Sequence, residues 1–255
     1  MKNLGFFYLF AIILSTNSSM KYAILTLFVL TTLSSCSKKE SNGNLHLTGN
    51  IEGLKKGTLY IQKIVDTALV AIDTIKINGD SHFSSDLNIQ SPEMYYLFLD
   101  RGITNSLDNN LSFFAEAGAI NIETSLEYFN SDAKITGSKN QEKYEEYKKI
   151  ISRFTDENLS LMEKKFNAFK NKNMKVVDSI EKLQNLNLKR RYLFTTNFAL
   201  NNKDFEVAPY LALSEISDIN LKYLDTIQKT MTPKITQSLY GKKLIQFYKE
   251  RKKQE

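Results

Sequence analysis

Cys36 is the residue whose type and surroundings most clearly define a chemical reaction. It is the only cysteine of the 255-residue sequence, and it follows Leu33-Ser34-Ser35 at the end of an apolar run. An aliphatic residue, two small residues and a cysteine at this place are typical of a lipobox, in which the thiol takes a diacylglyceryl group and cleavage makes the cysteine the first residue. We therefore predict that Cys36 is lipidated. An ordinary secretory signal with a chance cysteine is the alternative.

The other residue types that catalyse reactions or bind metals are scattered along the sequence. The two histidines, His46 and His82, lack the spacing of a metal-ligand pair and would need Asp73 or Glu116 to complete a site. The sequence contains no Gly-x-Ser-x-Gly elbow, phosphate loop or dinucleotide fingerprint. We predict ordinary surface or half-buried histidines, carboxylates that accept hydrogen bonds from turn amides, and neither a metal nor a cofactor.

The residues before Cys36 have the features of an export signal. Met20-Lys21 precedes the apolar run 23–33, which is shorter than the roughly 20 residues that a spanning helix needs. We predict a signal peptide over residues 1–35 and a polar tether over residues 36–44. Because Met1-Lys2 and the apolar run 6–14 repeat the pattern, translation from Met20 is the simplest interpretation, and a two-helix membrane hairpin is the alternative.

The charge of the chain is mildly basic. It carries 34 Lys and Arg against 28 Asp and Glu, a net charge of +6, and without Lys2 and Lys21 the remainder is 32 − 28 = +4. An exported protein does not normally meet nucleic acid, so we predict no nucleic-acid partner and assign the charge to solubility or to contact with anionic lipid. The predicted location is the cell envelope, facing the periplasm, with the outer membrane favoured over the inner.

Residues 45–138 have the two-residue period of β-strands. Apolar and polar residues alternate in segments such as 45–51 and 119–124, and Asn78-Gly79-Asp80 is a strong tight-turn signal. Phe83 is expected to face inward, and the nearly continuous apolar run 93–99 fits a strand buried on both faces. About eight short strands predict an antiparallel sandwich or barrel.

Residues 139–255 have helical periodicity instead. Ser138 is a candidate N-cap with Gln141 and Glu142 behind it, and Asn171-Lys172-Asn173 predicts a turn between two long helices. This half is predicted to be an α-helical bundle, so the fold class is α+β. Aromatic residues at helical spacing are expected to be core: Tyr144, Tyr147, Phe154, Phe166 and Phe169.

The order of turn glycines and core positions resembles a known family. The matching segments of the first half are 49–54, 57–60, 73–74, 77–79, 83, 114–118 and 135–138, and those of the second half are 208–211 and 240–244. The pattern is similar to an N-terminal β-domain of unknown function in lipoproteins of the Bacteroidetes group. In many relatives a helical segment and then a thioredoxin-like domain of thiol-disulfide oxidoreductases follow it. The chain ends where that last domain would begin, so the resemblance implies no redox residue here.

These observations lead to two classes of function. The favoured one is a non-catalytic binding or scaffold lipoprotein that holds an envelope partner through a sheet edge or the helical surface. The alternatives are a hydrolase or metal-dependent enzyme with a dispersed site, or an accessory subunit to a separate thioredoxin-like oxidoreductase.

Overall fold

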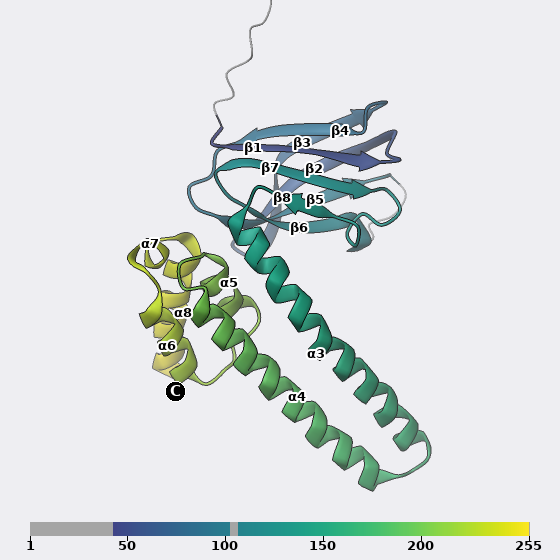
Figure 1. Ribbon diagram of the computed structural model, residues 1–255, viewed down its shortest axis with the longest axis vertical. Coiled ribbons are helices and arrows are strands. Elements are labelled where there is room, and N and C mark those ends of the chain that lie inside the picture. The colour runs from purple at the N-terminus through teal and green to yellow at the C-terminus, as the bar shows by residue number, and fades with distance from the viewer. Residues whose placement is uncertain (1–42, 103–106, 255) are drawn as a thin grey trace, which may run out of the picture. The chain divides into compact units, whose positions relative to one another are not determined.

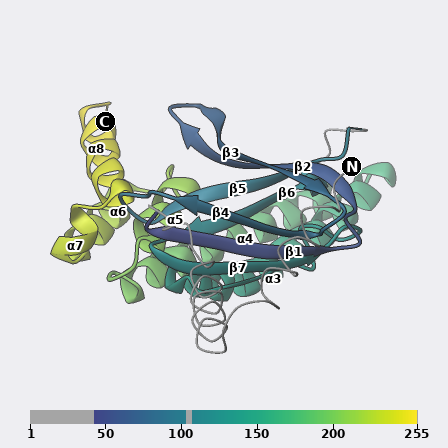
Figure 2. The same cartoon turned by 90° about the horizontal axis from the view of Figure 1, so that it is seen from above.

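Eight strands form two four-stranded sheets that pack face to face (Figures 1 and 2). The computed structural model describes residues 43–102 and 107–254. Strand order is β4-β1-β7-β8 in one sheet and β3-β2-β5-β6 in the other. The strand bounds are β1 Leu45–Glu52, β2 Lys56–Val65, β3 Ala68–Asn78, β4 His82–Leu87, β5 Glu93–Asp100, β6 Asn110–Ala115, β7 Gly118–Ser125 and β8 Lys134–Thr136, with a short 3-10 helix, Leu107–Asn109, before β6.

Alternating apolar residues build the core between the sheets. In β1, Leu45, Leu47 and Ile51 are fully buried while the residues between them face outward, as the two-residue period predicts. Phe83 is 5% exposed and lies in the same core. The predicted fold class, an α+β chain with an N-terminal β-sandwich and a helical second half, is confirmed.

One sheet is mixed rather than wholly antiparallel. β1 pairs with β4 antiparallel but with β7 parallel, from Leu45 opposite Gly118 to Glu52 opposite Ser125. A parallel neighbour requires a crossover instead of a hairpin. Here β2 to β6 form that crossover: β2, β3, β5 and β6 make the second sheet, and β4 pairs with β1 in the first. The sequence pattern cannot reveal this pairing, because the apolar alternation of a strand is the same for parallel and antiparallel neighbours.

The second half of the described chain is helical. Two long helices form an antiparallel hairpin, and four shorter ones gather beside its base (Figure 1). The bounds are α3 Lys139–Lys170, α4 Met174–Asn201, α5 Val207–Ser214, α6 Leu221–Thr230, α7 Pro233–Thr236 and α8 Leu239–Gln254. Asn171 ends α3 and Asn173 caps α4 through its side chain, so the predicted turn is confirmed. None of the helices in the described residues has the length and apolar character to cross a membrane.

The strands give way to helices at Gly137 and Ser138. Gly137 has φ +94°, and a Cβ there would lie 1.9 Å from the carbonyl oxygen of Ala119, so only glycine fits. The Ser138 hydroxyl accepts a hydrogen bond from the Gln141 N–H at 3.0 Å. The predicted N-cap is therefore confirmed, and it lies at the expected limit between the β-rich and helical segments.

The helical segment packs directly on the outer face of the second sheet. Phe114 of β6 is fully buried, and its ring centroid lies 5.8, 5.2 and 6.3 Å from those of Tyr144, Tyr210 and Tyr240. Met94 of β5 joins the same cluster. The first part of β5 is therefore covered on both faces, as its apolar run predicts. All described residues belong to one compact unit.

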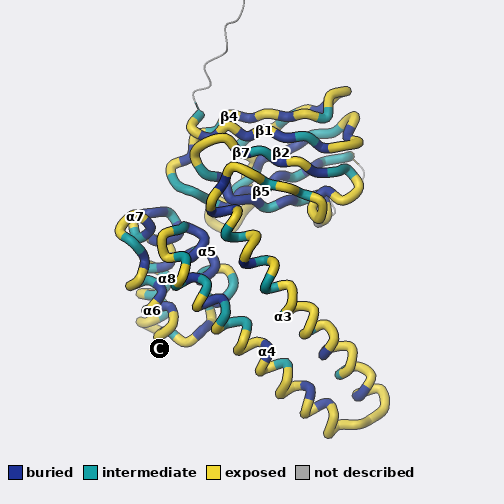
Figure 3. Tube along the Cα trace, viewed as in Figure 1, coloured by how far each residue is buried: buried dark blue, intermediate teal, exposed yellow. Residues whose placement is uncertain are grey.

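The far part of the α3–α4 hairpin is mostly exposed (Figure 3). Its own core contains only Leu161, Ala168, Val177 and Ile180. The prediction that Phe166 and Phe169 are core residues is wrong, because they are 68% and 64% exposed. A two-helix layer can cover one stripe on each helix, and these side chains lie on a second stripe that no described element covers.

Candidate functional site

Most of the residues that the sequence singles out for chemistry are separated in the structure. Cys36, the predicted lipidation site, lies outside the described residues. His46 and His82 lie on neighbouring strands, four residues apart along the ladder, which is roughly 13 Å. Each ring contacts a local carboxylate, with the His46 Nδ1 2.6 Å from Asp86 and the His82 Nδ1 2.8 Å from Asp80. This separation places the two histidines too far apart to bind one metal ion.

Asp73 is engaged by its own neighbourhood on β3. One carboxylate oxygen accepts a hydrogen bond from the Thr74 N–H at 2.7 Å, and the other accepts one from the Ser85 hydroxyl of β4. Both oxygens are therefore engaged inside β3 and β4 and not at a strand end or turn, which gives this carboxylate a structural role.

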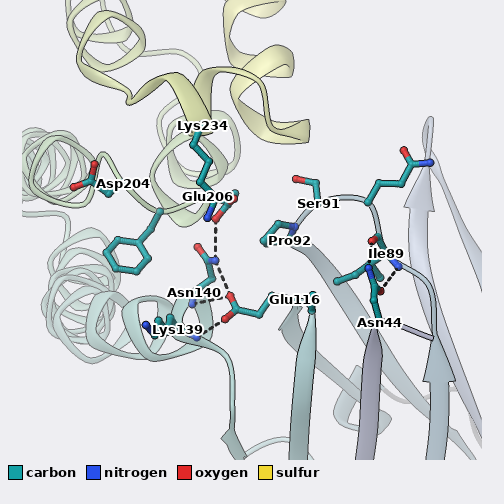
Figure 4. Close-up of a pocket in the computed structure, with 13 residues that line it drawn as sticks. Asn44, Ile89, Ser91, Pro92, Glu116, Lys139, Asn140, Asp204, Glu206 and Lys234 are labelled. Atoms are coloured by element: carbon teal, nitrogen blue, oxygen red, sulfur yellow. Dashed lines mark hydrogen bonds between the residues drawn. The ribbon is translucent and has the colours of Figure 1, made fainter. Parts of the chain in front are cut away.

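Glu116 belongs to a carboxylate–amide network at the junction of sheet and helices (Figure 4). Its carboxylate accepts hydrogen bonds from the N–H groups of Lys139 and Asn140 at 2.8 and 3.2 Å, in the first turn of α3. The Asn140 side-chain amide donates to Glu116 at 2.7 Å and to Glu206, which is 3% exposed, at 3.0 Å. Asn140 also accepts a bond from the Val207 N–H at 3.0 Å. A carboxylate here stabilises the N-terminus of α3.

The network lines a cleft of about 460 Å³ between the β4–β5 loop and the helices. Lys139 and Lys234 also line it, as does Asp204 (Figure 4). In the residues that the structure describes, no group of three or more His, Cys, Asp or Glu side chains is placed to hold a metal ion. Glu116 is committed to helix α3 and Glu206 to Asn140, so we interpret the network as the structural joint between the two halves.

A cluster of buried tyrosines holds the same joint. The Tyr240 hydroxyl accepts a hydrogen bond from the Met94 N–H at 2.9 Å, and the Tyr147 hydroxyl lies 2.9 Å from the Thr195 hydroxyl oxygen. Burial raises the pKa of Tyr147, Tyr210 and Tyr240 well above its ordinary value of 10.0. At neutral pH these groups are uncharged and act as hydrogen-bonding core residues.

The end of the β2–β3 hairpin is the most accessible apolar part of the β-sandwich. Ile64 and Val65 of β2 are 44% and 43% exposed, and Leu69 and Val70 of β3 are 48% and 42% exposed. We call residues 62–71 the β-arm. It begins where Ile72 is inserted as a bulge, because Ile61 pairs with Asp73 but Gln62 pairs with Ala71. Figure 2 shows the β-arm standing away from the sheets.

Strand β3 is the outermost strand of its sheet in the described structure. Residues 68–72, Ala-Leu-Val-Ala-Ile, are all apolar, and no Lys or Pro interrupts them. Edge strands usually carry a Lys or a Pro, which prevents them from pairing with strands of other chains. At the opposite edge, β6 is covered, since the Gln141 side chain of α3 accepts a hydrogen bond from the Phe114 N–H at 2.8 Å. The two edges of this sheet therefore differ in whether a helix covers them.

A groove separates the β-arm from α5 and α8. It has a volume of about 530 Å³, and Ile64 and Asp66 of the β-arm line one side. Leu213 and Phe247 are among the apolar residues on the helical side. The β-arm residues that line the groove belong to β2 and to the turn, and none belongs to β3.

Three arginines of the helical half form contacts within the chain. Arg190 forms an ion pair with Glu157 and Arg191 with Glu215. Arg251, in the last turn of α8, donates to the carbonyl oxygens of Ser217 and Ile219 at 2.6 and 2.8 Å. Its guanidinium therefore ties α8 to the segment that precedes α6.

Comparison with known proteins agrees with this division of the chain. Residues 45–144 match a family model described as Domain of unknown function (DUF4369). The match spans all eight strands and the first residues of α3, including Gln141 and Tyr144, which contact β6. It supports the predicted N-terminal domain of unknown function. No curated protein matches the sequence. The link to lipoproteins and to thioredoxin-like oxidoreductases stays a prediction.

Several of these features were not apparent from the sequence. Asn140, Glu206 and the exposed side chains of the β-arm were not singled out, and Gln141 was expected only to support its own helix. The unbroken apolar run 68–72 was a usable signal for the β-arm, because a strand with one solvent-facing side should alternate.

Proposed function

We propose that this protein is a lipid-anchored, periplasm-facing scaffold module of the cell envelope that holds a partner protein by strand addition at β3. The observation that carries the proposal is the uncovered edge of β3 with its apolar residues 68–72. A partner segment in extended conformation would gain backbone hydrogen bonds along this edge, and its alternate side chains would contact Leu69 and Val70.

Exposed apolar side chains of β3 support the same function. Because Leu69 and Val70 are 48% and 42% exposed, a bound segment could bury apolar side chains on them and not only pair its backbone. The lipid anchor predicted at Cys36 would hold the module at the membrane and raise its local concentration near other envelope proteins.

The alternative classes have less support. A hydrolase or metal-dependent enzyme would need free polar groups in a cleft, but Glu116 accepts two backbone hydrogen bonds and shares Asn140 with Glu206. An accessory subunit to a separate thioredoxin-like oxidoreductase is a special case of the scaffold function, with that enzyme as the partner.

The test is affinity capture of the anchored protein from its own envelope after crosslinking. Val70→Lys places a charge on the edge and should abolish capture of the partner, because charged edge residues oppose strand pairing. Leu193→Lys on α4 is the matched control, since Leu193 is 46% exposed and Val70 42%. A partner that both variants retain, or that the control also loses, would contradict binding at β3.

A further inference from the structure

The exposed face of α3 carries a stripe with the spacing of a coiled coil. We call Leu159, Met162, Phe166 and Phe169 the α3 stripe; they are 57%, 52%, 68% and 64% exposed. The steps of three, four and three residues follow the alternating three–four spacing of a heptad, which packs one helix against another. A surface with this repeat fits a helix better than a strand or an irregular segment.

Helix α4 cannot cover this stripe. On α3, the buried residues that face α4 include Leu161 and Ala168. Met162 and Phe169 each follow one of them by one residue, which turns the side chain by about 100° around the helix. The α3 stripe therefore points to the side of the hairpin, and the described chain provides no other element there (Figure 3).

We propose that the α3 stripe is the contact between two copies of this chain, with the two α3 helices packed antiparallel. An antiparallel alignment centred at residue 164 places Leu159 opposite Phe169 of the second copy and Met162 opposite Phe166 of the second copy. Every stripe residue then meets an apolar residue of unlike shape. The stripe is thus complementary to itself, which a two-fold contact requires.

One pair of opposite charges beside the stripe fits this alignment, whereas the Glu163 side chains of the two copies meet near the two-fold axis as like charges. Asp156 and Lys170 lie on the same side of α3, about two turns before and two turns after the centre. The alignment brings Asp156 to within two residues of the level of Lys170 of the second copy, about 3 Å along the helix axis, and the two-fold symmetry repeats this pair of opposite charges. Such pairs beside an apolar seam favour one orientation of the helices over the other.

The size of the stripe suits a dimer. An aromatic side chain offers about 150–250 Å², so the two phenylalanines and their two neighbours expose on the order of 400 Å² of apolar surface. The core of a protein–protein interface is about 65% apolar, so this apolar area corresponds to a total area of about 600 Å² buried on each copy. A standard interface buries roughly 800 Å² on each partner. The contact is separate from β3 and does not depend on which partner β3 binds.

The test is thiol crosslinking of the full chain in its own membrane. Glu163→Cys places a thiol beside the stripe near the two-fold axis, whereas Lys164→Cys places one on the opposite side of α3, and both positions are exposed. Because packed helix axes lie about 8–10 Å apart, a short bismaleimide should join two copies of the Glu163→Cys variant through the introduced thiols. The parent chain, whose only cysteine is Cys36, measures background.

We expect a covalent dimer with Glu163→Cys that is at least several-fold more abundant than with Lys164→Cys. Adding Phe166→Glu should remove this dimer, while adding Leu186→Glu on α4, 51% exposed, should not. Equal crosslinking at positions 163 and 164, no dimer at 163, or a dimer that persists with Phe166→Glu would each overturn the proposal. Adducts of position 163 with another protein in place of the dimer would overturn it in favour of a different partner.

Discussion

The hydroxyl of Tyr240 accepts a hydrogen bond from the backbone N–H of Met94 at 2.9 Å, across 146 residues of sequence. Met94 begins the buried part of β5, and Tyr240 lies near the start of α8. Two elements that the sequence assigns to different halves of the chain thus complete each other. The bond satisfies a strand amide that lies beyond the end of the β2–β5 pairing at Tyr95.

Removing this hydroxyl should destabilise the whole described unit. Tyr240→Phe leaves the buried Met94 N–H without its partner, which costs about 1–3 kcal/mol of the free energy of unfolding. Tyr223→Phe on α6 is the control, because Tyr223 is 38% exposed and surface changes stay within about 0.5 kcal/mol. Urea denaturation followed by circular dichroism measures both. Equal stability of the two variants would show that the bond contributes nothing.

Phe114 should control how firmly the two halves hold together. Phe114→Ala empties a fully buried site among three tyrosine rings and should cost about 3–5 kcal/mol. Limited proteolysis should then cut this variant near Gly137, giving a β-rich fragment and a helical one, at protease levels that leave the parent intact. Phe166→Ala, at a site 68% exposed, should behave like the parent. A helical signal in the fragment that ends near Ser138 would contradict the predicted division.

Stability should fall steeply at alkaline pH. Burial raises the pKa of Tyr95 to about 12 and holds that of Tyr210 above its ordinary value of 10.0. In the unfolded chain these groups lose their protons near pH 10, so their contribution to stability is complete below pH 10 and is lost as the pH rises toward about 12. The urea midpoint at pH 8 and pH 11 measures this loss. Tyr210→Phe removes one such group and should lose less between the two pH values; an equal or larger loss would contradict the assignment.

Lipidation of Cys36 is expected to anchor the protein. Mass spectrometry of the mature protein should find an acylated Cys36 as the first residue, and Cys36→Ala should move the protein from the membrane to the soluble fraction. Ser35→Thr is a milder control that keeps a small polar residue before the cysteine. Finding an unmodified Cys36 in a membrane-free periplasmic fraction would contradict this prediction.

The chain described by this sequence should have no thiol-disulfide exchange activity. Exchange needs an attacking thiolate, and the only cysteine is the one predicted to carry lipid. A form that starts at Ser37 should reduce insulin at the background rate, with a known dithiol oxidoreductase as the positive control. Turnover above background would overturn this prediction.

The local sequence determined which segments form strands and helices, and where several of them begin or end. Alternation predicted the strands and the inward position of Phe83. Ser138 was predicted as an N-cap and Asn171-Lys172-Asn173 as a turn, because the partners that define them lie within a few residues. These features depend on neighbours in the chain, whose positions follow from the backbone geometry of each element.

The contacts that decide the fold and its surfaces were settled only by the tertiary structure. Periodicity gives the face on which a residue lies but not what covers that face, so Phe154 and Phe166 look alike in sequence although only Phe166 is left exposed. In β1, the alternation of apolar and polar residues likewise shows which face is buried but does not show that the parallel neighbour is β7. The Gln141 side-chain amide donates to Glu145 of its own helix, but its Oε1 accepts a hydrogen bond from the N–H of Phe114, 27 residues away. Such partners depend on how separate elements pack, because distance in space and not along the chain determines which polar groups can meet.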